Sequence, residues 1–171
     1  AKRVAQLEAQ LADSDVAAEM FGYTEKQLPD GSPRTPLEEL IRWRLWNRTG
    51  GGLMAELGSH QLDAAGIFIS AMHGKGKKVK PLTVTAVGNR SIFPDDREVD
   101  DHVYCMFEYP APDYAENPNK KIVVTYSSIN GNGFGGYGEV VMGTEGTLIL
   151  EQEQNVMLYK GSSRDTRVTV S

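Results

Sequence analysis

Apolar residues recur at helical spacing in the first half of the chain and alternate with polar residues in the second half. At the start, Val4, Leu7 and Leu11 lie three and four residues apart, which predicts an amphipathic helix over residues 2–18. We expect this helix to pack on the rest of the fold or on a part that the sequence lacks. A turn is predicted over residues 28–33, so residues 1–34 form an N-terminal helical arm and loop.

A second helix is predicted over residues 36–48. Thr35 can cap its N-terminus, Pro36 suits its first position, and Glu38 can complete a capping box. The helix carries three arginines near its end, which form either a solvated face or a contact to an anion or sugar. Arg48 is the candidate for such a contact because it directly precedes a run of glycines.

The central segment begins with Gly50–Gly52 and continues as an apolar run to about Met72. At about 100° per residue, Glu56, His60 and Asp63 fall on one narrow arc of the predicted helix. The rest of its circumference is almost entirely apolar, which predicts a buried helix. Titratable groups are costly to bury unless they are paired or used, so this polar stripe is the leading candidate for the chemistry.

The stripe has two interpretations. In the first, its residues only satisfy each other, because Glu56 and His60 are spaced i,i+4 and His60 and Asp63 are spaced i,i+3. In the second, which we favour, the carboxylates orient an imidazole that transfers a proton to or from a hydroxyl. The three glycines would then let backbone approach a ligand and would expose N–H groups at the helix start. A metal site is disfavoured because no second histidine and no cysteine lie nearby.

From residue 82 onward the period changes to two, which predicts six or seven strands joined by short links. They cover residues 82–87, 103–109, 122–126, 140–142, 147–150, 156–159 and 167–170. We expect an α+β fold in which a large, mainly antiparallel open sheet has the helices on one face. The other face is half-apolar and has no helix to cover it, which favours a homo-oligomer formed through the open sheet face.

Composition narrows the possible partners. The chain has 171 residues, a net charge of −5 and one cysteine, Cys105. The charge disfavours nucleic acid and anionic membranes as partners, and the longest apolar run is too short to span a bilayer. A single cysteine excludes an internal disulfide and a cysteine-based zinc site. The chain begins at Ala1 without a signal peptide and looks like a piece of a longer polypeptide, so its compartment, cytoplasmic or periplasmic, stays open.

Three other motifs are interpreted as structural. Gly131–Gly136 matches the dinucleotide pattern G-x-G-x-x-G, but it leads into a predicted strand, so we expect a hairpin loop and no nucleotide site. The pair Asp101/His102 could be catalytic, although a solvated strand start is the favoured interpretation. Cys105 is expected to be a core thiol.

The central motif Gly50-Gly51-Gly52-x-x-x-Glu56-x-Gly58-x-His60-x-x-Asp63 resembles the signature in the C-terminal domain of Gfo/Idh/MocA NAD(P)-dependent oxidoreductases. The strand at residues 107–109 and the hairpin at residues 143–148 are also similar to that domain. The resemblance covers roughly residues 36–160. It implies that residues 35–171 form the family's C-terminal α/β domain, with an open sheet like that of the glyceraldehyde-3-phosphate dehydrogenase C-terminal domain.

The resemblance also implies a two-domain enzyme. A Rossmann domain would bind NAD or NADP and supply a catalytic lysine from a Glu-Lys-Pro motif, and this chain would supply substrate contacts and the oligomer interface. By the same resemblance His60 is the acid/base at a sugar or polyol hydroxyl, with Glu56 and Asp63 positioning it. The substrate-binding residues would be Asn47, Arg48, Thr49, Gly50, Gly51 and Gly52. The family position of Glu56 is commonly Asp.

The sequence contains neither a Glu-Lys-Pro motif nor a glycine fingerprint between a strand and a helix. We therefore expect the missing Rossmann domain to be a partner, and the fragment alone to lack cofactor-binding residues and activity. Two alternatives stay open at this point. One is an NAD-assisted glycosidase or isomerase of the same family, and the other is a non-enzymatic module that binds a partner chain through its sheet.

Overall fold

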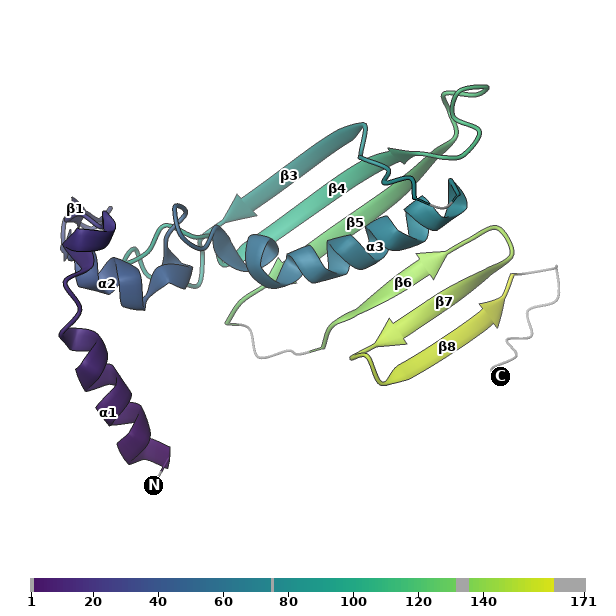
Figure 1. Ribbon diagram of the computed structural model, residues 1–171. Coiled ribbons are helices and arrows are strands. Elements are labelled where there is room, and N and C mark those ends of the chain that lie inside the picture. The colour runs from purple at the N-terminus through teal and green to yellow at the C-terminus, as the bar shows by residue number, and fades with distance from the viewer. Residues whose placement is uncertain (1, 75, 132–135, 162–171) are drawn as a thin grey trace. The chain divides into compact units, whose positions relative to one another are not determined.

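The computed structural model describes residues 2–74, 76–131 and 136–161, and its helices precede its main strands, as the sequence pattern predicts (Figure 1). The chain divides into two compact units, residues 1–131 and residues 132–171. The first unit holds the helices, the three-stranded sheet β3–β4–β5 and a two-residue ribbon of β1 (Lys26–Gln27) and β2 (Pro33–Arg34). The second holds a separate three-stranded sheet.

Helix α1 spans Lys2–Ser14 and ends earlier than predicted. The Ser14 hydroxyl donates to the carbonyl of Leu11 at 2.6 Å, and a short 3-10 turn, η1 (Ala18–Phe21), follows. Gly22 closes that turn with a φ of +82°. No residue of α1 is buried, so its apolar stripe is uncovered and the expected packing against the rest of the fold is absent from the described residues.

Helix α2 spans only Pro36–Ile41, and the predicted extension to residue 48 is wrong. Its start is confirmed, because Thr35 Oγ1 accepts from the backbone N–H of Glu38 at 3.1 Å. The Glu38 carboxylate accepts from Arg42 Nη1 instead of completing a capping box. After α2 the chain forms a 3-10 turn, η2 (Trp43–Leu45), and the fully buried Trp46 then takes an extended backbone.

The central helix has a break in its register that the sequence pattern does not reveal. A π turn, η3 (Met54–Gly58), precedes α3 (Ser59–Met72). Gly74, with a φ of +95°, follows the last turn of α3 and ends the helix. The predicted full burial is wrong for this chain, because Ile69 is the only buried residue of α3.

The sheet of the first unit consists of β3 (Thr83–Asn89), β4 (His102–Pro110) and β5 (Lys121–Ile129), all antiparallel. Ile69 of α3 packs on the buried Cys105, Phe107 and Tyr109 of β4, and Figure 1 shows α3 along one face of this sheet. The prediction of Cys105 as a core thiol is confirmed. The opposite face leaves large side chains exposed, namely Val87, Tyr104, Met106, Val123 and Ile129.

The second unit is an antiparallel meander of β6 (Gly138–Met142), β7 (Gly146–Glu151) and β8 (Asn155–Lys160). Its first link is the predicted hairpin, in which Gly143 donates its N–H to the carbonyl of Gly146 at 2.8 Å. The α+β class and the antiparallel pairing are thus confirmed, and the structure divides the predicted sheet into two sheets of three strands. The strand predicted at residues 167–170 and most of the Gly131–Gly136 motif lie outside the described residues.

Candidate functional site

The glycine run wraps around one carbonyl group. The carbonyl of Trp46 accepts from the N–H groups of Gly50 at 2.8 Å and of Gly51 at 3.2 Å. A side chain at Gly50 would meet the backbone of Arg44 at 2.9 Å, and Gly51 and Gly52 have φ values of +69° and +81°. Only glycine fits these positions readily. The N–H groups of Gly50 and Gly51 point inward, which corrects the expectation that they are offered to a ligand.

The preceding residues are held by side chains from elsewhere in the first unit. The backbone N–H of Asn47 donates to Glu98 Oε2 at 3.0 Å, and the hydroxyl of Thr49 donates to the carbonyl of Trp43 at 2.6 Å. The Asn47 side chain is exposed. All the candidate substrate-binding residues therefore lie in one fixed segment, residues 47–52, which we call the glycine segment.

Arg48 is tied to a buried ionic network. Glu39 Oε1 accepts from Arg48 Nε and Glu39 Oε2 accepts from Arg34 Nη2, each at 2.8 Å. The Arg34 and Glu39 side chains are 0% exposed, whereas that of Arg48 is 47% exposed. Burial alone would raise the pKa of the Glu39 carboxyl, but the hydrogen bond from Arg48 and the charge of Arg34 lower it instead. A buried carboxylate between two guanidinium groups keeps its charge.

The predicted polar stripe is only partly assembled. Glu56 lies in the π turn, and its carboxylate accepts from Arg44 Nε. A π turn closes i→i+5 hydrogen bonds, so the α-helical spacing assumed between Glu56 and His60 does not apply. His60 and Asp63 follow in α3 and are both exposed. Among the described residues no hydrogen bond or ion pair joins the His60 ring to either carboxylate.

An exposed apolar side chain lies on the same open side of α3 as His60. Ile67 is 60% exposed, and the adjacent Phe68 is also exposed. At helical spacing Ile67 follows His60 by two turns, so the imidazole lies within an uncovered apolar surface. A surface of this kind on one helix usually meets another domain or subunit.

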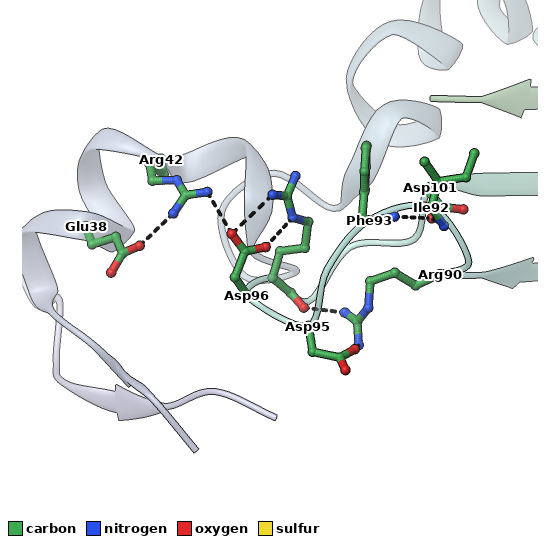
Figure 2. Close-up of polar contacts among 9 residues, drawn as sticks. Glu38, Arg42, Arg90, Ile92, Phe93, Asp95, Asp96 and Asp101 are labelled. Carbon is green, nitrogen blue, oxygen red and sulfur yellow. Dashed lines mark hydrogen bonds and ion pairs between the residues drawn. The ribbon is translucent and has the colours of Figure 1, made fainter. Parts of the chain in front are cut away.

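Asp101 anchors the loop that leads into β4. Its buried carboxylate accepts from the backbone N–H groups of Ser91 and Phe93, each at 2.8 Å, and also from that of Ile92. Figure 2 shows Ile92 and Phe93 beside Asp101. His102 Nδ1 lies 2.6 Å from its other oxygen. Burial would raise the pKa of Asp101, but these donors outweigh it and lower the pKa to about 2. The prediction of a solvated strand start is therefore wrong.

A chain of ion pairs joins the same loop to α2. Arg42 contacts Glu38 at 2.8 Å and Asp96 at 3.3 Å, and Arg97 contacts Asp96 at 2.6 Å (Figure 2). In addition, the backbone N–H groups of Glu98 and Val99 donate to the carbonyl of Leu45. The loop over residues 90–101 thus holds the glycine segment in place through hydrogen bonds to its first residue and to the residues that precede it. Sequence reasoning missed this role, although the alternating acidic residues and arginines of residues 90–101 indicate a loop held by ion pairs.

Other site types find little support among the described residues. These residues contain no group of three or more His, Cys, Asp or Glu side chains placed to hold a metal ion. Likewise, none of their helices combines the length and the hydropathy needed to cross a membrane. What the arrangement offers chemically is a solvent-accessible imidazole at His60, a paired carboxylate at Glu56 and a partly exposed guanidinium at Arg48.

The fold and the site together define an α+β domain in which one helix, preceded by a tight glycine segment, covers an antiparallel sheet. The GFO/IDH/MocA C-terminal domain model matches residues 29–149, and the chain belongs to that family. This confirms the resemblance based on the central motif. The searches of curated proteins and of solved structures returned no match to the chain.

Proposed function

We propose that this chain is the substrate-binding and oligomerisation domain of an NAD(P)-dependent oxidoreductase that acts on a sugar or polyol hydroxyl. The observation that carries the proposal is the open face of α3, where exposed His60 and Asp63 share one arc of the helix with the exposed Ile67. A nucleotide-binding domain seated on this face would exclude water from the imidazole. The imidazole of His60 would then accept or return the proton of the substrate hydroxyl.

The residues present do not suit the cofactor itself. A dinucleotide pyrophosphate needs free backbone N–H groups at a glycine-rich turn that opens a helix, but those of Gly50 and Gly51 already donate to Trp46. We therefore assign the binding of NAD or NADP to a domain outside these residues. The part of this chain is to bind the substrate and to move the proton.

The test compares this chain with a version extended upstream. Calorimetry with NAD and with NADP should give no binding to the chain alone and binding to the extended protein. In the extended protein, His60→Ala should lower turnover by about two to four orders of magnitude if the imidazole is the acid/base. His73→Ala is the matched control, because His73 follows the far end of α3, where its ring is hydrogen-bonded to the carbonyl of Pro110. Equal turnover in the two variants would contradict the role of His60.

The same proposal includes self-association through the open face of the β3–β4–β5 sheet. Val87, Tyr104 and Met106 are exposed on this face, opposite the side that α3 covers. Aromatic and methionine side chains are enriched at interfaces.

A further inference from the structure

We propose that Arg48 binds an oxyanion, so that the substrate of this domain carries a carboxylate or a phosphate group in addition to its hydroxyl. The inference rests on the proposed substrate role of the glycine segment and adds the chemical class of the ligand. Its first support is geometric. Arg48 Nε is used by Glu39, and no described residue accepts from Arg48 Nη1 or Nη2.

The guanidinium of Arg48 is held in place. The buried carboxylate of Glu39 fixes its Nε, and the ring of Tyr23 lies 5.0 Å from its central carbon. A guanidinium with one N–H engaged still has four N–H groups on its two terminal nitrogens. Two parallel N–H groups on a rigid plane match the oxygens of a carboxylate or phosphate. Because its orientation is already fixed, Arg48 loses little side-chain entropy when an anion binds.

The charges around Arg48 also favour an anion. Two arginines, Arg34 and Arg48, share the single carboxylate of Glu39. Lys26 adds a third positive charge, close enough to lower the pKa of Glu39. The second carboxylate is that of Glu98, whose Oε1 lies 3.6 Å from Arg34 Nη1. Three cations therefore face two carboxylates, which leaves one positive charge in excess beside the glycine segment.

The other arginines of this region lack that excess. Arg42 uses one terminal nitrogen on Glu38 and the other on Asp96, and Arg97 is paired with Asp96. Arg44 is more exposed than Arg48, at 62%, but its charge is matched by the Glu56 carboxylate. Arg44 thus provides a control of the same residue type, four positions away in the sequence.

The experiment titrates the present chain with inorganic phosphate, D-glucuronate or D-glucose. Binding is measured from the NMR signal of the Arg48 Nε–H group. Phosphate or glucuronate should shift this signal saturably, and glucose should not. Anion binding to Arg48→Gln, measured from the backbone amide shifts of the glycine segment, should be about tenfold weaker than binding to the wild type, because the charge-assisted hydrogen bonds from the guanidinium are lost. Arg44→Gln should change it less than about twofold. A preference for phosphate would indicate a phosphorylated sugar, and a preference for glucuronate a sugar acid.

Equal loss of anion binding in the two variants, or no saturable shift in the wild type, would overturn the proposal. Arg48→Lys keeps the charge without the planar fork and should bind the anion more weakly than the wild type, which separates specific geometry from net charge. Preserved amide shifts in β4 and β5 check that each variant is folded. None of these outcomes depends on cofactor binding or turnover, so the result is independent of the test of the proposed function.

Discussion

At the scale of single residues, Gly58 allows the π turn to approach β5. A Cβ atom at this position would lie 2.6 Å from Cζ of Tyr126. Gly58→Ala should therefore lower the free energy of unfolding by about 1–3 kcal/mol, the usual effect of overpacking. Thermal or urea denaturation of the chain measures the change.

The matched control for this prediction is Gly66→Ala in α3, the helix that follows the π turn. Apart from the backbone of the helix itself, no atom lies within 4 Å of a Cβ built on Gly66. Alanine there should raise stability by about 0.5–1 kcal/mol, because it favours the helix without a clash. Equal destabilisation by the two substitutions would show that the Gly58–Tyr126 approach is unimportant.

Because of Asp101, we expect the free energy of unfolding to fall at acidic pH. Its pKa is about 2 in the folded chain and near its ordinary value of 3.8 in the unfolded chain. The unfolded state therefore takes up a proton first as the pH falls, so the contribution of Asp101 is fully present above about pH 4 and is lost between pH 4 and 2. Asp101→Asn should be less stable at pH 7 and should lose less stability over this interval. Urea denaturation at a series of pH values tests it, and parallel curves for the two proteins would refute it.

At the scale of elements, the link between β7 and β8 adopts an unfavourable backbone. Gln152 and Glu153 have φ values of +52° and +56°, a region that side chains other than glycine rarely adopt. Gln152→Gly should stabilise this hairpin by about 1 kcal/mol. Gln154 lies two residues further on and is not one of the positive-φ residues. The control substitution Gln154→Gly should therefore destabilise the hairpin. Hydrogen exchange of the β7 and β8 amides distinguishes the two variants, and equal protection would count against the prediction.

The elements predictable from the sequence are those with local signals. The Thr35 cap and the alternation that defines β3 to β8 both depend on near neighbours in the chain. The end of α2 at Ile41 depends instead on the burial of Trp46 and on hydrogen bonds from residues 98–99 to Leu45. These contacts join residues more than fifty positions apart, so the hydrophobic periodicity of the sequence does not indicate them.

The candidate site was predictable only as a set of residues. The motif located the glycine segment and the helix, but the partner of Glu56 is Arg44 and the partner of Arg48 is Glu39. Local spacing indicates which side chains share a helical face only while the helix is regular. It carries no information about ionic partners that the fold supplies from another element.

At the scale of the whole molecule, the open sheet face predicts self-association. Met106→Lys places a charge in this face and should give a monomer at concentrations where the wild type is oligomeric, as measured by light scattering. Ile67→Lys makes the same change on the open face of α3, which we assign to the nucleotide-binding domain, and should leave the oligomer intact. A strictly monomeric wild type, or dissociation by Ile67→Lys alone, would contradict this assignment.

The π turn at Met54–Gly58 has a consequence for sequence comparison. It amounts to one additional residue within an otherwise α-helical path. Because the wider turn takes up that residue, deleting it would restore regular winding and leave His60 facing the same direction relative to the glycine segment. Alignments to relatives with a regular helix should therefore place a one-residue gap between Gly52 and Gly58, and an ungapped alignment would equate residues that face different directions.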